Sequence, residues 1–227
     1  MAAVRAPGDP MTARSVHAEL LRLRSDYLLP GFAVLTLVLS AAVNAGQQSD
    51  PSTGLAQATV ITMIFGSVRY TLDTRNGLIG RAVLAGGRTQ ALLAKAAVTA
   101  VAGAVIGILG GLCTAVATGL DGSVLPDLFG AMLSAAAGAV FGLCVGVVIR
   151  NHFAAPVTVL AVHLGSILVL QSWPAVGAAL PLGATMALVS DTQPDFLPQP
   201  AAIAALLAWT AIASACAWLT MTMRDLG

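Results

Sequence analysis

The histidines and one serine are the residues of this chain whose types could do acid–base or nucleophilic chemistry. The histidines are His17, His152 and His163, and none is followed by Glu, so the H-E-x-x-H motif of zinc proteases is absent. An intramembrane serine protease needs its nucleophile and its histidine on different helices, whereas His163 and Ser166 share one apolar run. We therefore predict no catalytic residue.

The remaining reactive groups also fit structural roles. Cys113, Cys144 and Cys216 all fall in apolar runs, where a thiol packs as a small apolar group, so we predict neither a disulfide nor a metal site. We expect His163 to hydrogen-bond a neighbouring helix. A role in handling substrate or protons is the alternative, because ionisable groups inside membranes are often functional.

The chain lacks the loop that binds ATP phosphates. No G-x-x-x-x-G-K-[ST] sequence is present, and Gly86-Gly87-Arg88 lacks the Lys-Ser/Thr ending. Energy for any transport must come from a partner or from an ion gradient. Ion-coupled carriers usually hold a carboxylate near the middle of the membrane, and no Asp or Glu is expected inside a span, which disfavours proton or sodium coupling.

Uncharged runs define the elements that must position these residues. The composition is 57% hydrophobic and only 9% charged, and a helix needs about 20 apolar residues to cross a bilayer core of roughly 30 Å. We therefore predict an all-α integral membrane protein with six transmembrane helices. Their approximate ranges are 27–49, 55–72, 96–120, 128–149, 153–172 and 196–223.

The basic residues predict the orientation. With six spans, all eleven Lys and Arg lie at or near one side, and the opposite loops carry only aspartates: Asp50, Asp121, Asp127, Asp191 and Asp195. The positive-inside rule then places both termini in the cytoplasm. The net charge of +1 reflects this asymmetry and gives no basis for nucleic-acid binding.

Two spans and their flanks have unusual features. The second span begins late, after Pro51 and Gly54, and meets Arg69, which we expect to extend toward the headgroups at the membrane surface. After the fifth span, Pro174 and Pro181 predict a short helix or re-entrant segment over residues 175–190 on the outer face.

Glycines recur every fourth residue in the third and fourth spans. Residues four apart share a helix face, so each row forms a smooth groove. We expect the two rows to pack against each other within one subunit, with a dimer seam as the alternative. The rows are Gly103, Gly107, Gly111 and Gly138, Gly142, Gly146.

Two segments outside the spans are predicted on the cytoplasmic side. The first is an amphipathic helix at the membrane interface, with Val16, Leu20 and Leu23 on its apolar face and Glu19 on another. It follows a disordered tail, residues 1–10, so that residues 11–227 form a single six-span domain. The second segment, residues 73–88, is here named the connector; we expect a short helix in it that ends at Gly86-Gly87.

The connector carries a loose but recognisable pattern. Asp73 is followed by Gly77, then by a helix that contains Leu78, then by Arg88, and Lys95 follows seven residues later. With the six spans and the interfacial helix, this pattern resembles the coupling-helix region of type-2 ABC exporter permeases. The sequence has Asp73 where the family usually has Glu, and Gly86-Gly87 where a Pro is common.

The resemblance implies a transmembrane permease subunit in a prokaryotic cell (inner) membrane. It would pair with a second copy or a sister permease and with separate ABC ATP-binding subunits, which would hold the ATP and Mg²⁺, while this chain binds no cofactor itself. The residues that would contact the ATPase are Arg75, Asn76, Gly77, Leu78, Arg81 and Val83. The alternative is a solvated basic loop that contacts anionic lipid.

The resemblance also implies that the first, second and fifth spans line a translocation path between two subunits. Polar residues of these spans are Thr36, Asn44, Thr59, Thr62, Ser67, His163 and Gln171. The other wall residues are aliphatic, which favours a hydrophobic or amphipathic cargo such as a drug, lipid or peptide over a long sugar polymer. A membrane-embedded enzyme and an ATP-independent carrier are the alternative functions.

Overall fold

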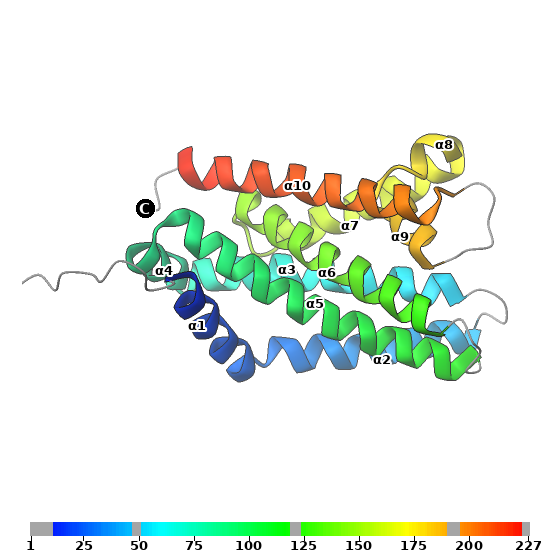
Figure 1. The fold of residues 1–227 in the computed structure, drawn as a ribbon, viewed down its shortest axis with the longest axis horizontal. Helices are drawn as coiled ribbons and strands as arrows, with labels where there is room; N and C mark the ends of the chain where they lie inside the picture. Colours follow the sequence, from blue (N-terminus) through cyan, green and yellow to red (C-terminus); the bar gives the residue numbers. More distant parts are fainter. Residues whose placement is uncertain (1–10, 47–50, 119–123, 190–195, 224–227) are drawn as a thin grey trace, which may run out of the picture.

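The chain folds into a bundle of helices that lie roughly side by side (Figure 1). The computed structural model describes residues 11–46, 51–118, 124–189 and 196–223, in which every regular element is a helix. The predicted tail, residues 1–10, lies outside this part of the chain. The helices are α1 (Met11–Ser25), α2 (Leu28–Gly46), α3 (Pro51–Arg75), α4 (Leu78–Gly86), α5 (Arg88–Thr118), α6 (Val124–Ile149), α7 (Ala154–Ser172), α8 (Pro174–Gly177), α9 (Pro181–Val189) and α10 (Gln199–Met223).

Within the described residues, five helices are long and apolar enough to cross a membrane. They are α2, α5, α6, α7 and α10, and they indicate a multi-pass membrane protein whose described part is all-α. The predicted second span corresponds to α3, which is 25 residues long but falls outside this set of apolar helices.

Burial explains the low hydropathy of α3. This helix packs against α2, α5, α6 and α7, and its middle part is almost entirely buried. By contrast, only 11% of the α2 span and 17% of each of the α7 and α10 spans are buried. A helix that faces lipid must be apolar, whereas one enclosed by other helices can carry hydroxyls that bond inside the protein.

The glycine rows pack differently from the prediction. A Cβ on Gly103 would lie 2.6 Å from the carbonyl oxygen of Ala135, so the α5 row does face α6. The α6 row instead faces α3, because a Cβ on Gly146 would lie 2.9 Å from the carbonyl oxygen of Ser67, and one on Gly142 would overlap Met63. The prediction that the two rows meet each other is therefore wrong: α6 lies between α5 and α3 and uses two separate faces.

The two ends of the bundle differ in structure. The α1 and α4 helices and the last turn of α10 lie at one end, and α8 and α9 lie at the other (Figure 1). The α8 and α9 helices occupy the segment for which a short helix or re-entrant element was expected. Small buried residues of α9, including Ala184 and Ala187, join a core cluster with α6 and α10, so apolar contacts hold α9 against the bundle.

Candidate functional site: a charge cluster beside a short connecting helix

The connector contains α4, a helix bounded by two glycines. Gly77 before it has φ 67° and Gly87 after it has φ 85°, a left-handed region that other residues rarely adopt. The amide of Gly87 donates to the carbonyl of Val83 at 2.8 Å, which closes the helix. The prediction that Gly86-Gly87 ends the helix is confirmed, and α5 begins directly afterwards at Arg88.

The α4 helix is seated on the bundle by one apolar face. Ile79 is buried in a cluster with Tyr70 and Leu92, and Val83 packs against the same cluster. The opposite face is open, because Arg81 is exposed and Leu84 is 88% exposed. The connector therefore has a fixed inner side and a free outer side.

A cluster of buried charges lies beside the connector, where α1, α3 and α5 meet. Glu19 accepts hydrogen bonds from three cations: its Oε2 lies 3.3 Å from Arg69 Nη2 and 3.4 Å from Lys95 Nζ, and its Oε1 lies 2.9 Å from Arg22 Nη1. Lys95 also pairs with Asp73. We call Glu19, Arg69, Asp73 and Lys95 the charge cluster; it joins three helices that are distant in sequence.

Burial removes these charged side chains from water, which costs free energy unless each one has a partner. Arg69 and Lys95 are each only 2% exposed, and Glu19 is 7% exposed. A buried charge is tolerated only with partners, and Arg69 meets this need with Glu19 and with the hydroxyl of Thr99, to which its Nη1 donates at 2.8 Å. The sequence prediction that Arg69 extends to the headgroups is therefore wrong. Glu19, which was predicted to lie off the apolar face of its helix, is buried against α3 and α5.

The end of the connector is tied to a fourth helix. The guanidinium of Arg88 donates to the carbonyl of Thr222 at 2.7 Å, at the last turn of α10. Close by, the indole of Trp218 donates to the hydroxyl of Thr89 at 3.1 Å. Because a helix C-terminus has unpaired carbonyls and a negative dipole end, Arg88 is a favourable cap for α10.

Two hollows adjoin the connector. One, of about 300 Å³, lies between α1, α4 and α5 and is bordered by Ser15, Glu19, Leu78 and Arg81 among others. The second, of about 250 Å³, is bordered by Asp26, Arg69, Asp73 and Asn76 among others. The charge cluster thus contributes Glu19 to the lining of the first hollow and Arg69 and Asp73 to the lining of the second.

The predicted coupling residues lie on both sides of the connector. Arg75, Asn76, Gly77 and Arg81 are exposed and accessible to a partner. Leu78 is half-buried and borders both hollows. As described above, Val83 faces the core, so its role is to seat α4.

The predicted path residues do not form one surface within the chain. Thr36, Thr59, Thr62 and Ser67 are buried in helix contacts, where Thr59 donates to Ser134 at 3.4 Å. The hydroxyls of the other three donate to carbonyls of their own helices, those of Phe32, Thr59 and Ile64.

The other three path residues lie elsewhere. Asn44 joins α2 to α5 through a 3.3 Å hydrogen bond to Thr114. His163 is half-buried and Gln171 is exposed on α7. The hydroxyl of Ser166, the residue considered with His163, donates to the carbonyl of Val162 at 2.8 Å. In the described residues, no group of three or more His, Cys, Asp or Glu is placed to hold a metal ion.

Sequence reasoning missed the charge cluster although its signals were present. Arg69 interrupts an otherwise apolar run, and Glu19 is the only Glu of the chain. Lys95 and Asp73 were both parts of the pattern that carried the family resemblance, yet nothing in their 22-residue separation showed that they pair. Leu84 was also missed, because its exposure depends on how α4 is seated.

Comparisons with known proteins give no assignment: no protein-family model matches this chain, and no curated protein matches it significantly.

Proposed function

We propose that this protein is the transmembrane permease subunit of an ATP-driven ABC exporter, and that the connector couples it to a separate ATP-binding subunit. The observation that carries the proposal is the way α4 is packed: its inner face is buried, its outer face is exposed, and the residues that flank it make the Asp73–Lys95 ion pair and the Arg88–Thr222 hydrogen bond. A partner that moves this short helix would move the long helices attached to it.

The contacts of the connector support such a lever. At its start, Asp73 of α3 pairs with Lys95 of α5, so the two helices that flank α4 are joined to each other. At its end, Arg88 joins α5 to α10. Displacement of α4 is therefore passed to three helices, with α1 linked through Glu19. The chain has no nucleotide-binding loop of its own, so the ATP and Mg²⁺ belong to the partner.

The proposal includes α3 as the sixth span. At 1.5 Å per residue its 25 residues extend about 37 Å, enough to cross the hydrocarbon core. The excess of Lys and Arg then lies on the side of α1 and α4, which we take to be the cytoplasm of a prokaryotic cell. The outer face of α4 would thus point to where an ATPase resides.

A second copy or a sister permease completes the path in this proposal. The surfaces of α2 and α7 are apolar and open, with Val34, Val38, Val157 and Leu168 each about 60% exposed or slightly more. Such surfaces suit a partner subunit on one side and lipid on the other. A largely aliphatic wall is compatible with a hydrophobic or amphipathic cargo.

The first experiment is purification of the tagged chain in mild detergent from its native host, with mass spectrometry of co-purifying proteins and measurement of ATP turnover. We expect an ATP-binding subunit in stoichiometric amount. We further expect that Arg81→Glu or Leu84→Asp lowers the turnover to that of the ATPase subunit alone, because each places a carboxylate on the outer face of α4.

Arg24→Glu is the matched control for the charge change. Arg24 is exposed on α1, at the same end of the bundle but outside the connector. It should leave turnover unchanged, and all variants should reach the membrane in equal amounts. Recovery of the chain as a stable oligomer without an ATPase would refute the exporter proposal and favour a carrier or an enzyme.

A further inference from the structure

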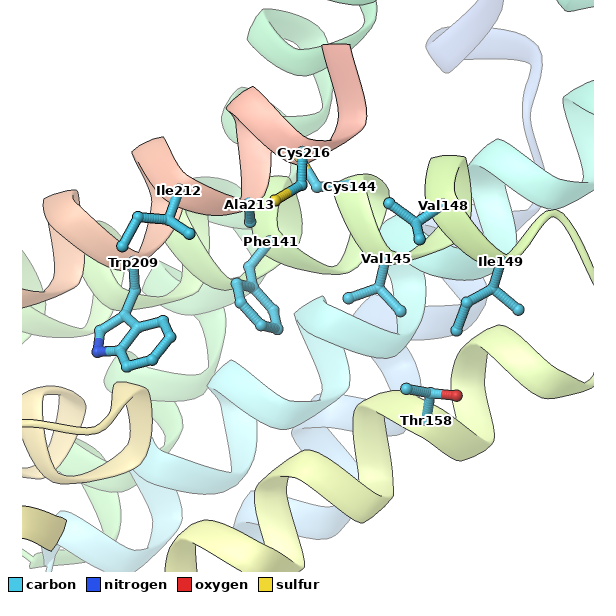
Figure 2. A pocket seen from close by; sticks show the side chains of 10 residues that line it. All are labelled: Phe141, Cys144, Val145, Val148, Ile149, Thr158, Trp209, Ile212, Ala213 and Cys216. Atoms are coloured by element: carbon cyan, nitrogen blue, oxygen red, sulfur yellow. The ribbon is translucent and has the colours of Figure 1, made fainter. Parts of the chain in front are cut away.

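Exposed apolar side chains differ in meaning between the spans and the end of the bundle. Apolar side chains of a span can face outward without penalty, since lipid tails are apolar too. The groove between α6, α7 and α10 is an example: Figure 2 shows Phe141, Val145 and Ile212 around it, and all three helices are candidate spans. Leu84 is 88% exposed on α4, which is not a candidate span. Its side chain is therefore left to water or to a partner outside the spans.

Leu84 shares the open side of α4 with Arg81. The two residues are three apart, so they lie on one side of the helix, and both are exposed. Arg75, which ends α3 just before this helix, is exposed as well. We call Arg75, Arg81 and Leu84 the docking face. Because the opposite side of α4 is packed on the bundle, Arg81 and Leu84 are held in place for a partner.

The docking face is positively charged, and its cations are unpaired. Neither Arg75 nor Arg81 has an ion pair with another described residue. The described carboxylates at this end of the bundle are engaged elsewhere. Glu19 and Asp73 belong to the charge cluster, and Asp26 accepts a hydrogen bond at 3.0 Å from the backbone amide two residues later. Within the described part of the chain, no carboxylate is available to either arginine.

The place of α4 favours a protein partner over lipid. Figure 1 shows α4 at the far end of the bundle, beyond the junction of α1 and α2. The α2 span begins at that junction, at Leu28, so α4 lies outside the hydrocarbon core. Anionic headgroups can pair with arginines there, but they offer no apolar contact to Leu84. A groove in a protein offers both, since interfaces combine an apolar centre with a polar rim.

We propose that the docking face enters an acidic groove of the ATP-binding subunit, in which carboxylates pair with Arg75 and Arg81 and an apolar pocket takes Leu84. The partner is that of the proposed function, on which this inference rests, and the acidic character of the groove is the new element. A guanidinium binds a carboxylate through two parallel hydrogen bonds, which gives geometric specificity as well as attraction. The nine residues of α4 extend about 14 Å, which sets the length of the groove.

The test measures binding between the full-length chain in phosphatidylcholine nanodiscs and the purified ATP-binding subunit that co-isolates with it. Salt screens attraction between exposed charges but not apolar burial. We expect the dissociation constant to rise about ten-fold between about 50 and about 500 mM NaCl, the size of two exposed ion pairs. Arg75→Gln with Arg81→Gln should remove this salt dependence, whereas Arg75→Lys with Arg81→Lys should keep most of it.

Leu84→Ala should weaken binding about ten-fold at both salt concentrations, because it removes apolar burial and no charge. Arg24→Gln is the matched control at an exposed position of α1, and it should change neither the affinity nor its salt dependence. A subunit that binds equally well at both salt concentrations would overturn the acidic groove and leave the exporter proposal standing. Failure to isolate any ATP-binding subunit would instead refute the exporter proposal, and this inference with it.

Modification of arginines by phenylglyoxal, read by mass spectrometry in the same nanodiscs, separates a protein partner from lipid. The ATP-binding subunit should protect Arg75 and Arg81 and leave Arg24 reactive. Phosphatidylglycerol in place of phosphatidylcholine, without the subunit, should leave Arg75 and Arg81 reactive. Protection of these two arginines by phosphatidylglycerol alone would assign the docking face to anionic lipid and overturn the proposal.

Discussion

Two contacts hold the α3 helix in place by opposite means. One is its contact with α6, and the other is the charge cluster beside α4. Along α6, side chains are missing: Gly138, Gly142 and Gly146 let the backbone of α3 approach directly. In the charge cluster, long side chains reach between helices: Arg69 and Lys95 both pair with Glu19 of α1, and Lys95 also pairs with Asp73 of α3.

The comparison shows how two kinds of contact respond to change. The glycine contact has no free space, so one added methyl group destabilises it, and a glycine has no side chain that a substitution could remove. The charge cluster has partners, so removing one group leaves a buried charge without compensation. The first contact is sensitive to additions and the second to deletions.

The largest loss of stability is expected when one charged side chain of the charge cluster is removed. Lys95→Met leaves Asp73 without its ion pair and leaves Glu19 with one fewer of its three cations. Breaking a buried pair in this way costs about 3–5 kcal/mol of stability. Thermal unfolding in detergent, followed by circular dichroism, measures the loss.

The double variant Lys95→Met with Asp73→Leu is the internal control for that measurement. Because it removes both partners of the pair, it should recover part of the stability lost by Lys95→Met alone. A Lys95→Met protein as stable as the parent would mean that the cluster does not hold α1, α3 and α5 together.

A smaller loss of stability is expected when a methyl group is added in the glycine contact between α3 and α6. The Cβ of Gly142→Ala would overlap Met63 on α3, so the helices must separate, at about 1–3 kcal/mol. Gly165→Ala on α7 is the matched control, since a Cβ there meets nothing within 4 Å. Equal stability of the two variants in the same unfolding assay would contradict the close approach of α3 and α6.

The smallest loss of stability is expected when the hydroxyl that bridges α3 and α6 is removed. Thr59→Val removes the donor to Ser134 and keeps the shape of the side chain, and hydrogen bonds between membrane helices average about 0.6 kcal/mol. Thr62→Val is the comparison, because its hydroxyl bonds within its own helix. If Thr62→Val costs as much as Thr59→Val, the bridge between helices adds nothing.

Much of the fold could be predicted because it depends on local sequence. The apolar runs predicted five spanning helices that the structure contains, and the Gly86-Gly87 pair predicted where α4 ends. The short helix of the connector could be predicted for the same reason, because a short helix between two long ones is visible in the order of residues. The packing partners were less predictable, as the glycine row of α6 illustrates.

The sequence by itself determined which stretches are helical and apolar enough to span a membrane, and it predicted that basic residues gather on one side. Only the tertiary structure decided that Arg69 turns inward, that Glu19 is buried, and that α6 lies between α3 and α5. The physical reason is that spans form from the local balance of apolar and charged residues against lipid. Lipid and protein interior are both apolar, so hydropathy cannot tell which face of a helix meets which neighbour.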